Sequence, residues 1–172
     1  MQDTVLRPFP AAGAPLVRRC AFTAASARLM EIPIALTEQA PSKLGGTNAA
    51  VRAAAGLEAP VFAKTAFSGF ASAELGEWLR DRGTAHLLIA GIETPICVYL
   101  TVLGALAAEF EVTVLTDATG GRRVEDLPPA WRMIEQAGAR LLPSETVFYS
   151  ILSDSAHPHF RAFTALVKQY AG

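Results

Sequence analysis

Short apolar runs alternate along the chain with longer segments in which apolar residues recur every three or four positions. The short runs predict buried strands, at residues 32–36, 61–64, 86–90, 111–117 and 139–143. The periodic segments predict helices, at residues 16–30, 48–55, 72–79, 96–108, 128–138 and 157–170. Strands that alternate with helices in this way form parallel βαβ units, in which helices cover both faces of a sheet.

We therefore predict an α/β fold with a doubly wound, mostly parallel sheet, as in a Rossmann-like three-layer sandwich. A chain of 172 residues suits one domain of ordinary size, and we expect residues 1–172 to form a single domain. The Pro/Ala/Gly-rich residues 8–15 predict a loop. Function in such sheets collects at the carboxyl ends of the strands, which here means the loops at residues 37–47, 64–70 and 91–97.

The composition narrows the choice of partners. Hydrophobic residues make up 51% of the chain, charged residues make up 18%, and the formal net charge is −1. This is enough apolar material for a core, and it provides no basic stripe of the kind that binds nucleic acid. No apolar run reaches the roughly 18 residues of a membrane span. We expect a small-molecule substrate, with neither nucleic acid nor membrane as a partner.

The two cysteines, Cys20 and Cys97, form neither a disulfide framework nor a C-x-x-C pair. The first residues lack the layout of a signal peptide, so a cytoplasmic protein with free thiols is expected. His86, His157 and His159 do not have the spacing of a metal site. The chain also lacks the glycine-rich motifs that bind nucleotides, and we expect neither a metal nor another cofactor.

Cys97 falls where the apolar run HLLIA passes into a predicted helix. The unpaired N–H groups at a helix start favour a thiolate and can serve as an oxyanion hole. Free cysteine is equally one of the most buried residue types, so this turn alone leaves open whether Cys97 is a nucleophile or part of the core. Cys20 lies in the middle of a helix on an apolar face, and we assign it to the core.

Lys64 ends the apolar run VFAK and precedes small and aromatic residues. A lysine there can be partly desolvated and stabilise a nearby thiolate, although most lysines lie on the surface. The neighbouring loops suggest an apolar, partly aromatic substrate pocket, with the candidate residues Phe67, Phe70, Pro95 and Ile96.

Four stretches together resemble the isochorismatase-like cysteine hydrolases. The second and third are the specific ones, because they are similar to the family's lysine motif K-x-x-F-S-x-F and its nucleophile motif G-x-x-x-x-x-C-V-x-x-T. In chain order the stretches are PIALTEQAPSKLGGT, VFAKTAFSGF, LLIAGIETPICVYLTVLGAL and EVTVLTDATGGR.

The resemblance implies a triad of aspartate, lysine and cysteine, of which Lys64 and Cys97 match two members by motif. It also implies a non-proline cis peptide at Ile92–Glu93, and an oxyanion hole made by the backbone N–H groups of Glu93 and Cys97. The implied activity is hydrolysis of a small amide, ester or vinyl ether by a homo-oligomer. The loop beginning with TEQ lacks the metal-binding residues of one branch of the family, so no metal is expected.

The start of the chain departs from the family pattern. The family opens with a central strand that ends in D-x-Q, and this chain opens with M-Q-D. We therefore expect the first strand and its catalytic aspartate to be missing from these 172 residues. Either Met1 is an internal methionine of a longer protein that carries them upstream, or the protein is short and another group takes their place. Asp3 and Glu38 are weak substitutes for that aspartate. Two readings follow: an active cysteine hydrolase, or a catalytically impaired member that acts in assembly or ligand binding. A thiol redox sensor is a third reading, but no resolving cysteine lies near Cys97.

Overall fold

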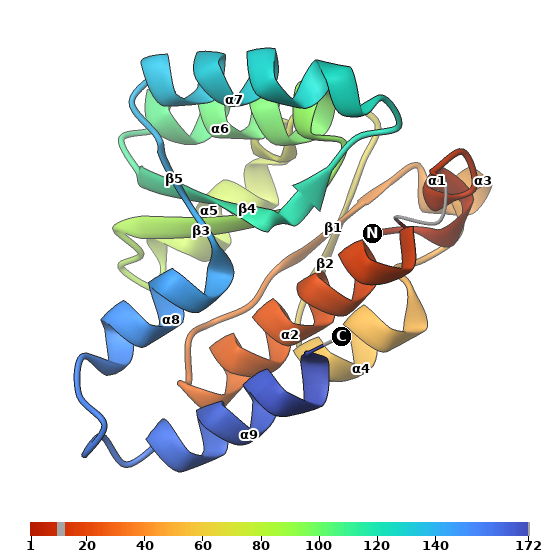
Figure 1. The fold of residues 1–172 in the computed structure, drawn as a ribbon. Helices are drawn as coiled ribbons and strands as arrows, with labels where there is room; N and C mark the ends of the chain where they lie inside the picture. Colours follow the sequence, from red (N-terminus) through yellow and green to blue (C-terminus); the bar gives the residue numbers. More distant parts are fainter. Residues whose placement is uncertain (10–12, 172) are drawn as a thin grey trace.

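Helices and parallel strands alternate in the computed structural model, which describes residues 1–9 and 13–171 (Figure 1). The strands are Leu36–Gln39 (β1), Val61–Lys64 (β2), His86–Ile92 (β3), Glu111–Gly120 (β4) and Arg140–Leu142 (β5). The helices are Asp3–Leu6 (α1), Gly13–Leu29 (α2), Pro41–Leu44 (α3), Ala49–Ala55 (α4), Ala73–Arg80 (α5), Tyr99–Ala107 (α6), Leu127–Gln136 (α7), Ser144–Leu152 (α8) and Phe160–Tyr170 (α9). The predicted α/β class, with parallel strands flanked by helices, is confirmed.

The strands form two separate sheets instead of one continuous sheet. In the first sheet β1 pairs with β2, from Leu36 opposite Val61 to Gln39 opposite Lys64. In the second sheet β4 lies between β3 and β5. Each sheet therefore has an edge, on β1 and on β3, that pairs with no other strand of the described residues, and a cavity lies between these two edges.

Before α2, the described residues form one short helix and a single β-bridge. Gln2 forms a single antiparallel bridge with Thr47, and α1 follows directly. Of the loop predicted at residues 8–15, residues 10–12 lie outside the described part of the chain. The helix α2 begins at Gly13, inside that predicted loop.

The predicted elements need two corrections, one to a strand and one for a helix that was not predicted. The strand predicted at 32–36 is wrong, because β1 lies at Leu36–Gln39. Ladder pairing starts where the Leu36 N–H donates to the Pro60 carbonyl, so residues 32–35 have no partner strand on that side. The second correction is α8, a helix that was not predicted. Its β-branched and aromatic residues have a low helix propensity, and packing against α2 and α9 overrides it.

Helices cover both faces of the larger sheet (Figure 1). On one face α5, α6 and α7 bury Leu75, Val102 and Ile134 against Val112 and Val114 of β4. On the other face lie α2, α8 and α9, where three buried phenylalanines pack edge-on or tilted against each other: Phe22, Phe148 and Phe163. Within the described ranges, no helix combines the length and apolarity needed to cross a membrane.

Candidate functional site

Cys97 lies in the turn that joins β3 to α6. The Ile92–Glu93 peptide bond is cis, and a π-helix at Thr94–Val98 leads into α6. The Glu93 carbonyl accepts hydrogen bonds from the N–H groups of Ile96 and Val98, both at 3.1 Å. Cys97 is half-buried and faces the cavity between the two sheets, so it is not a closed core position.

Lys64 ends β2, and its Nζ atom lies 3.9 Å from Cys97 Sγ. The same Nζ donates to Gln39 Oε1 at 2.7 Å and to the carbonyls of Phe67 and Ala66 at 2.8 and 3.1 Å. Three neutral oxygens therefore surround an ammonium group that has three donors. Burial lowers the pKa of Lys64. The negative charge of Cys97 and the hydrogen bond between the two side chains oppose that shift. The structure thus brings the two predicted catalytic side chains together.

The carboxyl ends of three strands meet at this point. Gln39 ends β1 and Lys64 ends β2, and Cys97 follows β3. The Lys64 ammonium touches both of the others. The strands flanking the cavity therefore run in the same direction, and the site occupies the edge predicted for function in a parallel sheet.

Two residues besides the predicted catalytic pair hold the site together. Gln39 orients the Lys64 ammonium through its side-chain oxygen. Thr101 Oγ1 donates to the Cys97 carbonyl at 2.6 Å and accepts from the Gly69 N–H at 2.9 Å, which ties the cysteine turn to the lysine loop. The signal for Thr101 was its position four residues after Cys97, one helical turn away.

Glu93 faces Arg122 from the next strand's loop. The carboxylate of Glu93 accepts from Arg122 Nε at 3.0 Å and from the Arg122 backbone N–H at 3.3 Å. Its side chain is only 13% exposed. The ion pair fixes the backbone that supplies one of the two predicted oxyanion donors, and both Glu93 and Cys97 line the cavity.

The acids considered as substitutes for the catalytic aspartate point elsewhere. Asp3 is exposed and accepts from Asn48 Nδ2 at 2.6 Å. Glu38 accepts from both the N–H and the hydroxyl of Thr47 at 2.7 Å. Over residues 1–9 and 13–171, no carboxylate is hydrogen-bonded or ion-paired to Lys64 or Cys97. The structure therefore does not place either acid as the base.

The cavity has a volume of about 640 Å³ and extends from the site along the space between β1 and β3. Phe67, Phe70 and Ile96 line it, as the sequence analysis expected. Pro95 is not part of the lining, and its ring packs beside Gly121 instead. In the part of the chain that the structure describes, no three His, Cys, Asp or Glu side chains are grouped to hold a metal ion.

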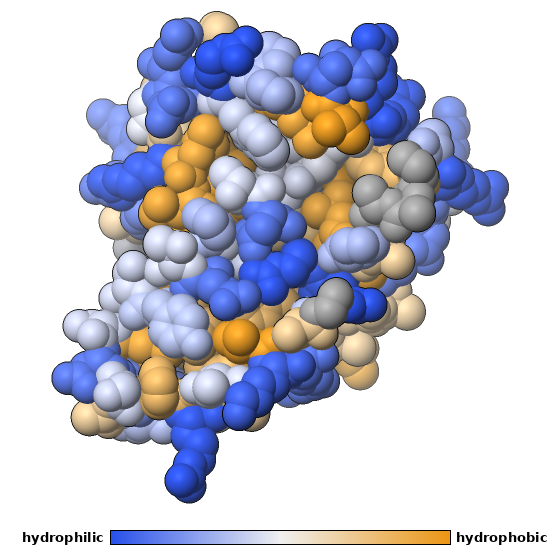
Figure 2. Space-filling view, viewed as in Figure 1, coloured by the Kyte–Doolittle hydropathy of each residue, from blue (hydrophilic) through white to orange (hydrophobic). Residues whose placement is uncertain are grey.

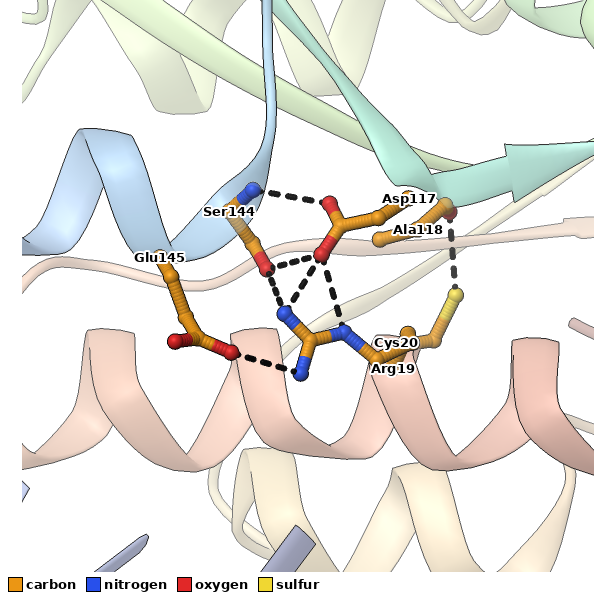
Figure 3. Close-up of polar contacts among 6 residues, drawn as sticks. All are labelled: Arg19, Cys20, Asp117, Ala118, Ser144 and Glu145. Carbon is orange, nitrogen blue, oxygen red and sulfur yellow. Dashed lines mark hydrogen bonds and ion pairs between the residues drawn. The ribbon is translucent and has the colours of Figure 1, made fainter. Parts of the chain in front are cut away.

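Asp117 of the fourth similar stretch has a structural role (Figure 3). It accepts from the Ser144 N–H and hydroxyl, both at 2.7 Å, and from Arg19 Nε at 2.9 Å. Burial opposes its ionisation, but the hydrogen bonds from Ser144 and Arg19 outweigh burial and hold the pKa of Asp117 below its usual value. Asp117 therefore joins β4 to the start of α8 and to α2. It does not face Cys97.

Cys20 lies beside this cluster in the core, as predicted. Its thiol donates to the Ala118 carbonyl at 3.2 Å, and its residue is 4% exposed. Burial raises the pKa of Cys20 to about 12. Both cysteines line the cavity, but their surroundings differ. Cys97 is half-buried beside a lysine, whereas the buried Cys20 thiol donates to a backbone carbonyl.

Comparison with known proteins agrees with this geometry. The isochorismatase domain matches residues 1–146 of the chain. Isochorismatase domain-containing protein 2 from Pongo abelii is 36% identical over 146 residues, which cover 84% of this chain and 69% of that protein.

Two solved structures are similar over nearly the whole chain. The MAR1 ribonuclease from Caenorhabditis elegans has a TM-score of 0.90 and 28% identity, and the match covers 97% of this chain and 85% of that chain. The YcaC gene product from Escherichia coli, described as an octameric hydrolase of unknown specificity, has a TM-score of 0.82 and 23% identity. That match covers 98% of this chain and 89% of the other, and at this identity it establishes the fold alone.

Proposed function

The chain belongs to the isochorismatase family, and on that premise we propose that it is a hydrolase in which Cys97 attacks a small amide, ester or vinyl-ether substrate. The observation that carries the proposal is the 3.9 Å contact between Lys64 Nζ and Cys97 Sγ at one end of an apolar cavity. A lysine ammonium beside a thiol favours the thiolate, which is the nucleophilic form.

In the proposed reaction the Lys64 ammonium, which is held by three neutral oxygens, stabilises the Cys97 thiolate, whose proton has passed to solvent. With an amide or ester, the Cys97 sulfur bonds to the substrate carbonyl carbon, and the carbonyl electron pair moves to oxygen. The N–H groups of Glu93 and Cys97 are the proposed donors to that oxyanion. Collapse expels the amine or alcohol, which takes a proton from Lys64. Water then attacks the thioester and gives a proton to Lys64, and the Cys97 thiolate leaves.

A catalytically impaired member that binds ligand without turnover is the second candidate. One observation favours it: in the described residues no carboxylate contacts Lys64 or Cys97 to take up the thiol proton. In this case the apolar cavity still binds small molecules, and Cys97 forms no acyl intermediate.

We include a homo-oligomer and a cytoplasmic location in the proposal. The octameric state described for YcaC supports self-association, and Met133 of α7 is exposed. Figure 2 shows apolar surface gathered in separate patches on the face in view. The free state of both thiols suits a reducing compartment.

A substrate panel with matched variants tests the proposal. Small amides, esters and vinyl ethers are incubated with wild type, Cys97→Ser and Cys20→Ser, and RNA is added to the panel because the worm relative is named a ribonuclease. We expect a thioester adduct on Cys97 by mass spectrometry, with turnover lost in Cys97→Ser and kept in Cys20→Ser. Turnover that survives in Cys97→Ser contradicts the nucleophile assignment. Binding without turnover or adduct in wild type supports the impaired member.

A further inference from the structure

The loop that follows β4 contacts the turn that joins β3 to α6. β4 pairs with β3 as far as Gly120. Gly121 comes next, and a Cβ built on it would lie 3.3 Å from Pro95 Cδ, so the loop and the turn are close together there. Arg122 follows and binds the side chain of Glu93. Consecutive residues of one loop therefore hold the turn at two points.

Both hydrogen bonds from Arg122 end on one oxygen of the Glu93 carboxylate. The Arg122 Nε atom lies 3.0 Å and its backbone nitrogen 3.3 Å from Glu93 Oε2. The side chain of Glu93 is 13% exposed, whereas that of Arg122 is 52% exposed. Among residues 1–9 and 13–171, Arg122 is the only residue that pairs with this carboxylate. A carboxylate so poorly hydrated needs a paired cation to keep its charge.

The Glu93 carboxylate belongs to the same turn as the proposed nucleophile. Glu93 directly precedes the π-helix Thr94–Val98, whose fourth residue is Cys97. The Glu93 carbonyl accepts from the Val98 N–H at 3.1 Å, which closes the turn around Cys97. Glu93 and Cys97 also line the same cavity. The carboxylate and the thiol therefore lie four residues apart on one hydrogen-bonded turn.

Two negative charges form on this turn in the proposed reaction, first on the Cys97 sulfur and then on the oxyanion beside the Glu93 N–H. An unpaired carboxylate on Glu93 would disfavour both, because like charges held close together oppose each other. Water screens this repulsion only weakly, since the carboxylate is mostly buried. Lys64 lies 3.9 Å from Cys97 Sγ, and in the described part of the chain it does not pair with Glu93. The cation that offsets the carboxylate is Arg122.

We propose that Arg122 is a positioning residue that acts through Glu93: its guanidinium neutralises the Glu93 carboxylate, so that a thiolate and an oxyanion can form on the same turn. The inference rests on the proposed hydrolase function, because both anions belong to that reaction. It separates charge from shape. Loss of Arg122 alone leaves an unpaired negative charge on the turn, whereas loss of both partners leaves none.

The rate of alkylation of Cys97 by iodoacetamide at pH 7 tests the proposal without any turnover. Arg122→Gln keeps the backbone bond to Glu93 and removes only the guanidinium, and we expect it to slow Cys97 about fivefold. In the double variant Glu93→Gln/Arg122→Gln we expect the rate to rise about threefold above that of Arg122→Gln, because the carboxylate has gone as well.

Arg123→Gln is the matched control. Arg123 is the next residue of the loop, its side chain is 68% exposed, and it pairs with exposed acids of its own loop. We expect the alkylation rate of this variant to equal that of wild type. Arg122→Lys keeps the positive charge with fewer donors, so it should react faster than Arg122→Gln. Thermal unfolding of each variant reports whether it folds.

Steady-state kinetics with a neutral substrate gives a second readout. The charges that Arg122 relieves form only after the substrate binds or in its transition state, so we expect Arg122→Gln to lower kcat more than it changes KM. The second substitution, Glu93→Gln, should recover part of kcat. If Arg122 served only to hold the shape of the turn, removal of the carboxylate would recover nothing.

Three results would each overturn the proposal: an Arg122→Gln alkylation rate equal to that of wild type, a double variant as slow as Arg122→Gln, or an equal loss in Arg123→Gln. If Arg122→Gln does not fold, Arg122→Lys and the double variant decide, since both leave the turn without net charge from this pair, and a fivefold loss in either would overturn the proposal. Failure of the hydrolase function has a different signature, namely turnover that survives Cys97→Ser, and it leaves the alkylation comparison intact.

Discussion

The ion pair between Asp117 and Arg19 gives a stability prediction that follows from the geometry in Figure 3. Asp117 holds three elements together, because its carboxylate accepts from Ser144 at the start of α8 and from Arg19 on α2. Asp117→Asn keeps the shape of the side chain and removes its charge. One oxygen can still accept from the Ser144 N–H, while the new NH₂ group faces the guanidinium of Arg19, donor against donor.

The magnitude follows from burial and from the number of bonds lost. The side chains of Arg19 and Asp117 are 21% and 26% exposed. Removing one partner of a fully buried pair costs about 3–5 kcal/mol, and exposed pairs contribute about 0–1 kcal/mol. We therefore expect Asp117→Asn to lower the free energy of unfolding by about 2–3 kcal/mol. For a chain of this size this lowers Tm by about 5–10 °C.

The stability difference between wild type and Asp117→Asn should depend on pH, which a change in packing alone would not cause. Because the folded-state pKa of Asp117 lies below its ordinary value of 3.8, its stabilisation is fully present above that value. It is lost as pH falls through the lower folded-state pKa. Urea unfolding of wild type and Asp117→Asn at pH 7, and then at falling pH below 4, should show a difference that shrinks toward acid.

Asp126→Asn is the matched control, because Asp126 pairs with Arg123 at 3.4 Å through side chains that are 43% and 68% exposed. We expect a change below about 0.5 kcal/mol for that variant. A loss below 0.5 kcal/mol for Asp117→Asn, or a loss that stays constant as pH falls, would refute the reasoning.

Three further predictions concern the site and its support. Gly104→Ala places a Cβ 2.7 Å from Phe70 Cβ, and we expect urea unfolding to show a loss of about 1–3 kcal/mol from overpacking. Thr101→Val leaves the Gly69 N–H without its acceptor, and we expect kcat/KM to fall about tenfold and stability to fall by about 1–2 kcal/mol. Burial lowers the pKa of Lys64 from 10.5. Because the Lys64 ammonium loses its proton in alkaline solution, we expect kcat/KM to decline there, with the midpoint of the decline below pH 10.5.

Each of these three predictions has its own control or contradicting result. Gly13→Ala meets its nearest neighbour at an ordinary 3.8 Å, and an equal loss there would show that packing at Gly104 is not the cause. Thr164 donates to the Phe160 carbonyl at 2.6 Å, in the same helical pattern as Thr101. Thr164→Val should leave kcat/KM unchanged. An alkaline decline centred at or above 10.5 would contradict the desolvation of Lys64.

Lys64 and Cys97 lie at the strand ends where their motifs predict them, whereas the sheet differs from the prediction. Lys64 and Cys97 could be named because their motifs depend on local order along the chain, and each motif fixes one side chain at the end of one strand. The division into two sheets could not be read from apolar periodicity, because a strand with one unpaired edge has the same pattern as a fully paired one. For the same reason the strand predicted at 32–36 was misplaced, since only the pairing with β2 defines where β1 begins.

Long-range polar contacts account for what else was missed. Gln39 acts on Lys64, 25 residues away, and Thr101 accepts from Gly69, 32 residues away. A single sequence carries no signal for such pairs, although the four-residue spacing from Cys97 to Thr101 is visible in the nucleophile motif. Pro95 was assigned to the pocket from its neighbourhood in sequence. The turn around the π-helix directs it toward Gly121 instead.

The central claim is that Lys64 activates Cys97, and the rate of alkylation of Cys97 by iodoacetamide at pH 7 tests it most directly. Peptide mass spectrometry follows both thiols in wild type, Lys64→Met and the surface control Lys43→Met. We predict that Cys97 reacts at least a hundredfold faster than Cys20, whose pKa is raised to about 12 by burial. Lys64→Met should slow Cys97 about tenfold, and Lys43→Met should leave it unchanged. Equal labelling of the two cysteines, or a Cys97 rate unaffected by Lys64→Met, would contradict the account.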